Sequence, residues 1–118
     1  MSPRRAGSRR SRPAELARVV PVFAALGDAT RLALVKRLCA GGPLSIARLT
    51  TGSPVTRQAI AKHLGVLAGA GLVHGVRRGR ERIWALDPGH LGVARSYLDQ
   101  ISFQWDKSLD RLKRFVEE

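Results

Sequence analysis

Apolar residues recur at helical spacing over residues 56–70, and the rest of the chain is organised around this segment. Ile60, Leu64 and Leu67 fall on one side of the predicted helix and are expected to be buried. Thr56 precedes them as a good N-cap, because its side-chain oxygen can accept a hydrogen bond from a free backbone amide of the first turn. The opposite side is small, polar and cationic, and it contains no carboxylate: Arg57, Gln58, Ala61, Lys62 and Gly65.

Three further helices are predicted before this segment, over residues 15–26, 29–39 and 45–50. Glycine and proline separate them, with Gly27 after the first helix and residues 41–43 after the second. Asp28 is expected to cap the second helix. In that helix we expect the buried residues to be Leu32, Val35 and Leu38, and the exposed residues to be Arg31, Lys36 and Arg37.

After Gly71 the spacing of apolar residues changes from the helical period to the alternation typical of strands. Residues 72–76 and 82–86 are predicted to form a hairpin whose tip is residues 77–80, with the sequence RRGR. Two helices joined by a short turn containing glycine, the second with a polar outer side, form a helix-turn-helix. Followed by a basic hairpin, this pattern predicts a mostly α fold with a small β-hairpin, that is, a winged helix-turn-helix.

A long helix is predicted from residue 88 to about residue 116. Its apolar residues are spaced 3, 4, 4, 3 and 4 apart and share one side of the helix. A helix of about thirty residues is about 40 Å long, which is more than a domain of this size can cover. We therefore expect a homodimer in which a second copy buries an apolar stripe made of Leu98, Ile101, Trp105, Leu109 and Leu112.

The charge is distributed unevenly along the 118 residues, which carry a formal net charge of +12. No carboxylate occurs between Asp28 and Glu81, although nine arginines and lysines do, whereas the segment from Asp87 onward is close to neutral. This asymmetry favours a polyanion held by the middle of the chain and a different role for its end.

The N-terminal residues 1–13 contain five arginines and almost no apolar residue. They are predicted to be a disordered basic tail before a single domain over residues 14–118. A transit peptide is less favoured, because the segment has no amphipathic side. No apolar run is long enough for a transmembrane helix or a secretory signal, so a cytoplasmic protein is the simplest expectation.

DNA is the polyanion that best fits the outer side of residues 56–70. Lysine and arginine bind phosphates or guanine, and glutamine can pair with N6 and N7 of adenine in the major groove. An ordinary amphipathic surface helix and a salt-bridged hairpin are the alternatives, but Glu81 alone cannot neutralise the arginines of the hairpin. The candidate residues for binding double-stranded DNA are Thr56, Arg57, Gln58, Ala61, Lys62, His63, Arg77, Arg78 and Arg80.

Two segments, ALGDATRLALVKRL and TRQAIAKHLGVLAGAGLV, resemble the ArsR family of winged-helix transcriptional repressors. The resemblance implies a homodimer that binds an imperfect inverted repeat, the operator, near a promoter. The end of the chain is similar to a sub-branch whose members lack metal-sensing ligands. Gly65 and Gly69 depart from the family pattern, in which these positions often carry longer side chains.

Metal sensing in the family requires sets of cysteine, histidine and carboxylate ligands, and this chain does not contain the usual sets. Cys39 is the only cysteine, so the paired thiols of the family's thiol sensors are missing, and no disulfide can form within the chain. His90 has no second histidine on the last helix, although Asp87 and Asp99 could complete part of a set. We expect no metal and no cofactor, and a metal-responsive repressor using His90 stays an alternative.

Other functions are weaker alternatives. No nucleophile–base pair and no glycine-rich phosphate loop after a strand can be identified, so we expect the protein not to be an enzyme. A dimeric winged helix that binds RNA or a protein partner would share the same basic surface.

Overall fold

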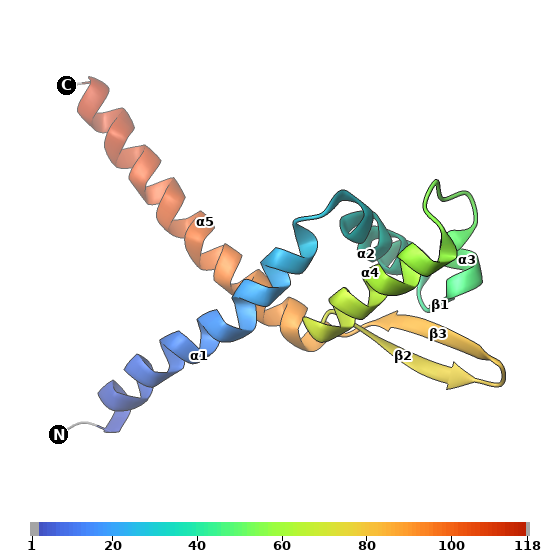
Figure 1. The fold of residues 1–118 in the computed structure, drawn as a ribbon. Coiled ribbons are helices and arrows are strands. Elements are labelled where there is room, and N and C mark those ends of the chain that lie inside the picture. Colours follow the sequence, from blue (N-terminus) through green and yellow to red (C-terminus); the bar gives the residue numbers. More distant parts are fainter. Residues whose placement is uncertain (1–2, 118) are drawn as a thin grey trace.

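The computed structural model describes the backbone of residues 3–117 and the side chains of residues 13–117. Four helices and a small sheet surround one core, and a fifth long helix completes the chain (Figure 1). In chain order the elements are α1 (Pro3–Leu26), α2 (Ala29–Gly41), β1 (Leu44–Ser45), α3 (Ile46–Thr50), α4 (Arg57–Gly69), β2 (Val73–Arg78), β3 (Glu81–Leu86) and α5 (Pro88–Glu117). This order agrees with the predicted winged helix-turn-helix.

Helix α1 is longer than the sequence pattern predicts. It begins at Pro3 and runs through Pro13 and Pro21, so the structure differs from the disordered tail expected over residues 1–13. Once a helix has formed, each added residue gains a backbone hydrogen bond, and arginine and alanine are good helix formers. The division of the chain at residue 13 stays a prediction.

The starts of α2, α3 and α4 are each capped by a polar side chain. Asp28 accepts a hydrogen bond of 3.0 Å from the Arg31 amide, Ser45 one of 3.2 Å from the Arg48 amide, and Thr56 one of 3.2 Å from the Ala59 amide. The capping roles predicted for Asp28 and Thr56 are confirmed. Because each cap is made within three residues, it can be recognised from the local sequence.

The hydrophobic core lies where α2, α3 and α4 meet the sheet. The prediction that Ile60, Leu64 and Leu67 are buried is confirmed, and Leu49 of α3 is also fully buried. The prediction for Leu32 was wrong, because its side chain is 46% exposed and Leu34 is buried in its place beside Val35 and Leu38. Helix α2 is therefore rotated so that the positions of Leu34, Val35 and Leu38 face α3 and α4.

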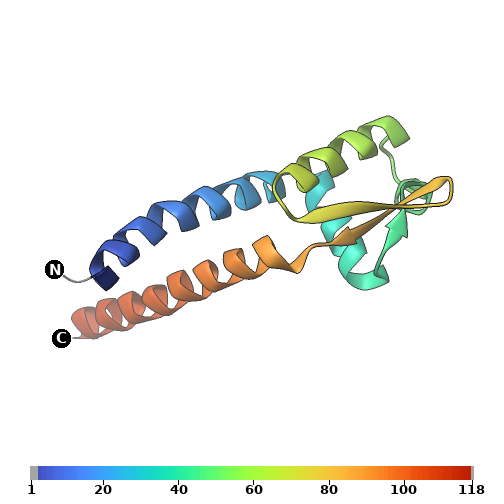
Figure 2. The same cartoon turned by 90° about the horizontal axis from the view of Figure 1, so that it is seen from below.

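The sheet has three strands in the order β1-β3-β2, one strand more than the predicted hairpin. Strand β1 is only two residues long and pairs antiparallel with β3, with Leu44 opposite Trp84. In the hairpin, Gly75 lies opposite Trp84, Arg77 opposite Arg82, and Arg78 opposite Glu81. Strand β1 joins the middle of β3 to the helical core, while the tip of the hairpin extends away from it (Figures 1 and 2).

Helices α1 and α5 pack against each other near the core and then diverge towards the two termini (Figure 1). The stripe predicted along α5 is largely uncovered within one chain, with Leu98 50% and Trp105 65% exposed. Asp87 precedes α5 and accepts a hydrogen bond of 3.0 Å from the Gly89 amide. None of the described helices combines the length and the apolar character needed to cross a membrane.

Candidate nucleic-acid interface

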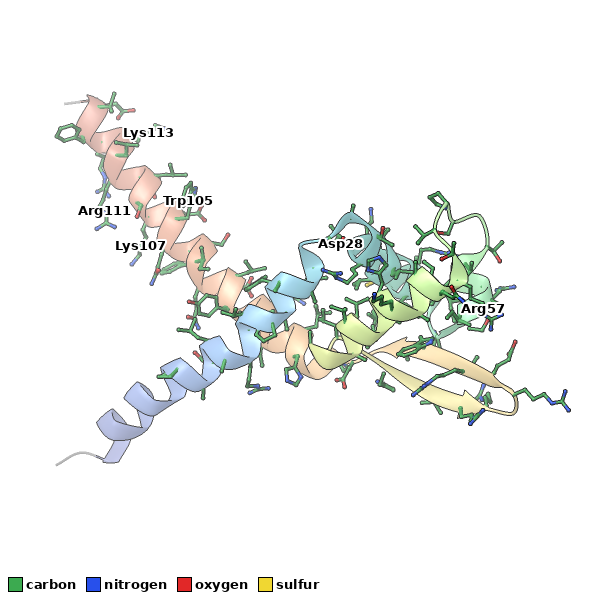
Figure 3. All side chains as sticks on the ribbon, in the orientation of Figure 1. Asp28, Arg57, Trp105, Lys107, Arg111 and Lys113 are labelled. Carbon is green, nitrogen blue, oxygen red and sulfur yellow. The ribbon has the colours of Figure 1, made fainter. Side chains whose placement is uncertain are left out.

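The outer side of α4 carries every polar side chain that the sequence predicts there, and all of them are exposed. Arg57 lies at the first turn of the helix, at the end of α4 that Figure 3 labels, and is exposed, as are Gln58, Ala61 and Lys62. Gly65 is exposed and has open space where a side chain would stand. The structure thus presents a shallow cationic helix surface that can approach another molecule closely.

The cations of this surface form no ion pair with a carboxylate among the side chains of residues 13–117. Among residues 13–117, whose side chains are described, the carboxylates within 4.0 Å of a basic side chain are Asp28 beside His63 and Asp87 beside His74. Arg57, Lys62, Arg77, Arg78 and Arg80 take no part in these pairs and remain open to solvent. Such a surface attracts a polyanion over a distance of about a Debye length, 8 Å at physiological salt.

Two arginines of the basic middle segment, Arg37 and Arg31, make hydrogen bonds that hold helices of the fold together. Arg37 donates hydrogen bonds to the backbone oxygens of Leu49, at 2.7 Å, and Arg48, at 2.8 Å, both in the last turn of α3. A cation there satisfies free carbonyl groups and complements the helix dipole. The sequence pattern placed Arg37 on the outside without this role, because a contact between two helices leaves no local signal.

Arg31 joins α1, α2 and α4. Its Nε atom donates to the Ala25 oxygen at 2.7 Å, and its Nη1 atom lies 3.3 Å from Nδ1 of His63. The Asp28 carboxylate lies 3.9 Å from the same histidine nitrogen. His63, which the sequence offers as a DNA-binding residue, is half-buried and turned towards this junction, so its DNA contact stays a prediction.

The Asp28 carboxyl titrates below its ordinary pKa of 3.8. The main cause of the lowered pKa is the hydrogen bond from the Arg31 amide, which outweighs the opposing effect of desolvation, and the charge of Arg31, the neighbouring His63 and a hydrogen bond from the Thr30 amide lower the pKa further. The carboxylate is therefore ionised at neutral pH, and it caps the start of α2.

The hairpin forms a wing whose turn contains Gly79, with a φ of 64° that favours glycine. Arg77, Arg78 and Arg80 surround this turn and are exposed. Helix α4 and the hairpin lie alongside each other, since α4 leads directly into β2 and contacts it (Figure 1). The structure therefore places two separate basic elements where one extended polyanion could contact both.

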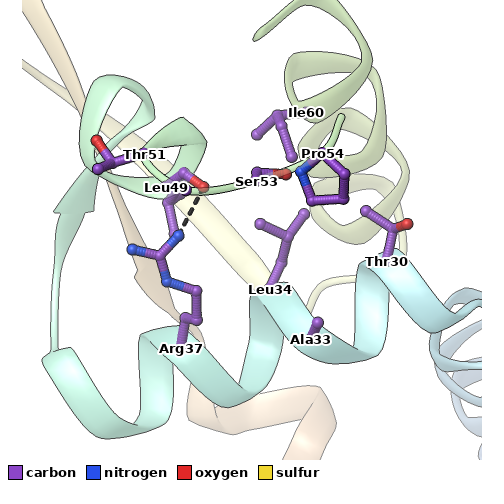
Figure 4. A pocket seen from close by; sticks show the side chains of 10 residues that line it. Thr30, Ala33, Leu34, Arg37, Leu49, Thr51, Ser53, Pro54 and Ile60 are labelled. Atoms are coloured by element: carbon purple, nitrogen blue, oxygen red, sulfur yellow. Dashed lines mark hydrogen bonds between the residues drawn. The ribbon is translucent and has the colours of Figure 1, made fainter. Parts of the chain in front are cut away.

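A pocket of about 330 Å³ lies between α2, α3 and the turn into α4 (Figure 4). Leu34, Leu49 and Ile60 form its apolar floor, and the hydrogen bond from Arg37 to Leu49 closes one side. Its lining includes no carboxylate, histidine or cysteine, so it offers neither a nucleophile–base pair nor a set of metal ligands.

The residues considered as metal ligands do not complete a metal site among the described residues. No group of three or more histidine, cysteine, aspartate or glutamate side chains forms a cluster within the described residues. The His90 ring packs on Gly71, where an added Cβ would lie 2.5 Å from Nδ1. Cys39 is exposed.

Comparisons with known proteins agree with this arrangement, although no family model matches the chain. It is 39% identical, over 93 residues, to the HTH-type transcriptional regulator Rv2034 of Mycobacterium tuberculosis, a match covering 79% of this chain and 83% of that protein. An ArsR-like transcriptional regulator from a Rhodococcus species is 38% identical, with a TM-score of 0.68, covering 84% of this chain and 92% of that one. The chain belongs to the ArsR-like family of winged helix-turn-helix transcriptional regulators.

A third known protein shares the fold of this chain at lower sequence identity. It is a homodimeric winged helix-turn-helix DNA-binding domain from Mycobacterium bovis, 23% identical, with a TM-score of 0.60. The match covers 94% of this chain and 93% of that one. The family resemblance deduced from the two sequence segments is confirmed.

Proposed function

We propose that this ArsR-like regulator is a homodimer that binds double-stranded DNA at an inverted-repeat operator and represses transcription there. Helix α4 enters the major groove, and the wing lies along the backbone or enters the minor groove. Base edges are contacted by Arg57, Gln58 and Lys62, while Arg77, Arg78 and Arg80 contact phosphates.

The outer side of α4 is the observation that carries this proposal. Arg57, Gln58 and Lys62 are exposed together on a helix whose opposite side is fully buried. The helix is thus fixed rigidly by its core residues Ile60 and Leu64 while its donors remain free. A rigid helix with free donors of this kind suits the recognition of base edges in a major groove.

The dimer follows from the apolar stripe on α5. Trp105, Leu109 and Leu112 are exposed on a part of the helix that extends beyond the core (Figure 3 labels Trp105). A second copy related by twofold symmetry would cover this stripe with the same residues. The homodimeric relative from Mycobacterium bovis supports this arrangement. Two α4 helices related by a twofold axis match an operator whose half-sites are inverted.

Selection of bound duplexes from a random DNA pool tests the proposal. We expect an enriched inverted repeat whose half-site centres are about 34–36 Å apart or a multiple of that spacing. Footprinting on the selected sequence should protect both halves, and single-stranded RNA of the same sequence should bind more weakly. Equal binding of RNA, or no enrichment of any duplex, would contradict the proposed function.

A further inference from the structure

The side chain of Arg82 in β3 is held in a defined position by two neighbours. Its guanidinium carbon lies 5.2 Å from the centre of the Trp84 ring, in a cation–π contact. Gly75, opposite Trp84 on β2, leaves the space that the arginine stem fills, because a Cβ there would lie 2.7 Å from Arg82 Nε. Glycine inside a strand often marks such a close approach.

Three arginines converge on this position. Arg77, Arg80 and Arg82 line, together with Gly75, a hollow of about 400 Å³ on one side of the wing. Arg77 and Arg82 are directly opposed in the strand register, an arrangement of like charges that is unfavourable in a sheet. Arg78, in contrast, lies opposite Glu81. The unfavourable pair would be relieved by an anion in the hollow.

We propose that Arg77, Arg80 and Arg82 form a phosphate-binding cradle that holds one phosphodiester of the DNA backbone. This inference rests on the proposed DNA-binding function and adds a residue, Arg82, to its contacts. A guanidinium presents its donors in a planar fork that matches two phosphate oxygens, and the ring beneath Arg82 fixes the orientation of that fork.

Trp84 and Gly75 act as positioning residues for Arg82. Trp84 is 8% exposed, and its buried indole nitrogen has no hydrogen-bond partner within the described part of the chain. The ring surface, not the N–H group, is therefore the part of Trp84 that Arg82 uses. Gly75 acts by lacking a side chain, since an alanine would push the arginine stem away from the ring.

The test measures affinity of the full-length chain for the selected operator and for scrambled duplex, across a range of salt concentrations. Arg82→Ala should weaken both about tenfold, as expected for a lost charged hydrogen bond. The slope of log affinity against log salt should fall measurably, by at most about 0.9 per subunit, because the three arginines share one phosphate. Trp84→Phe, which keeps a ring under Arg82, should retain most of the affinity.

Gly75→Ala tests whether Gly75 affects DNA affinity by positioning Arg82 or only through the stability of the strand. Alanine is more favourable than glycine within a strand, so thermal stability should not fall, yet DNA affinity should fall towards that of Arg82→Ala. In the Arg82→Ala background, the same change should have no further effect on affinity, because the two residues act as one unit. An equal loss in both backgrounds would show that Gly75 does not act through Arg82.

Lys107→Ala is the matched control for the loss of one charge. Lys107 also lies over an aromatic ring, 4.8 Å from the centre of Phe103, but on α5 and far from the wing in sequence. Lys107→Ala should change neither the affinity for DNA nor the salt slope. If the wild type binds the operator and Arg82→Ala keeps the full slope, the cradle is wrong while the proposed function stands. If calorimetry with sodium phosphate shows binding that depends on Arg82 while DNA affinity does not, the site holds free phosphate instead.

Discussion

Arg31 Nη1 lies 3.3 Å from His63 Nδ1 and so connects the first turn of α2 to the middle of α4. The same guanidinium donates through Nε to the Ala25 oxygen near the end of α1. Three helices that are separate in sequence are therefore tied through one side chain. Since α1 also packs against α5, this junction lies between the proposed dimer interface and the proposed DNA-binding surface.

Arg31→Ala should lower the free energy of unfolding by about 1–3 kcal/mol, because it leaves the Ala25 carbonyl without its charged donor. It should also weaken binding to every duplex by a similar factor, since α4 loses a positioning contact and no base contact. Urea unfolding and DNA titration would measure both effects. Lys36→Ala, an exposed change in the same helix, is the control and should alter neither. A change of base preference in Arg31→Ala would instead show that Arg31 contacts bases directly.

Asp28 makes part of the stability depend on pH. Its pKa in the folded state lies below the ordinary 3.8, so its stabilising contribution is complete above 3.8 and is lost as the pH falls through the folded-state pKa. Asp28→Asn keeps an N-cap oxygen but removes this titration. The difference in unfolding free energy between wild type and variant should be largest near about pH 7 and shrink near about pH 3. A difference that stays constant over this range would contradict the role given to the carboxylate.

Features that depend on neighbours in sequence could be predicted without the structure. Thr56 caps α4 through an amide three residues away, and Ile60, Leu64 and Leu67 share a side because a helix repeats every 3.6 residues. Strand β1 could not be predicted in this way, because two residues carry no period and Leu44 forms a strand only by pairing with Trp84. Leu32 and Leu34 both fit a buried helical position, and only tertiary packing decides between them.

The candidate DNA-binding surface, like the fold, could be predicted where it depends on local sequence and not where it depends on contacts between elements. The exposed positions of Arg57, Gln58 and Lys62 follow from the helical period once Ile60 and Leu64 are buried. The roles of Arg31 and Arg37 within the fold, and of Arg82 beside Gly75, depend on contacts across helices or strands. A count of basic residues along the chain cannot distinguish such arginines from those that remain free to bind DNA.

Ile101→Asp should prevent the proposed dimer from forming. Burying a side chain of this size is worth about 1.5–3 kcal/mol, and twofold symmetry applies the loss twice. Sedimentation of the variant at micromolar concentration should show monomers or aggregates. Phe103→Asp is the control, because Phe103 is exposed on α5 but lies off the apolar stripe, so this variant should remain dimeric. A wild type that sediments as a monomer under these conditions would rule out the interface.

DNA binding should not depend on a first-row transition metal. His90 is packed on Gly71, and no cluster of three potential ligands occurs in the described part of the chain. Affinity for the selected operator should therefore be the same with zinc, with cobalt and with a chelator. A reproducible tenfold change, which corresponds to about 1.4 kcal/mol of coupling, would show that His90 and nearby carboxylates bind metal in the assembled dimer.

The recognition helix and the wing should contribute differently to DNA affinity. Gln58 is exposed on the outer side of α4, where its amide can pair with the N6 and N7 positions of adenine. Gln58→Ala should therefore cost about 1–3 kcal/mol on the selected operator and little on scrambled DNA, so base preference is relaxed. Arg80 lies at the wing tip, and Arg80→Ala should weaken both duplexes evenly and reduce the salt slope by at most about one charge per subunit.

Salt titration of both variants on both duplexes separates these two contributions. A base contact changes the ratio of the two affinities at every salt concentration, because the lost hydrogen bond is specific to one sequence. A phosphate contact changes the slope and leaves the ratio intact, because every duplex carries the same backbone charge. If Gln58→Ala loses equal affinity for operator and scrambled DNA, α4 does not read bases, and the surface formed by Arg57, Gln58 and Lys62 is a general polyanion site.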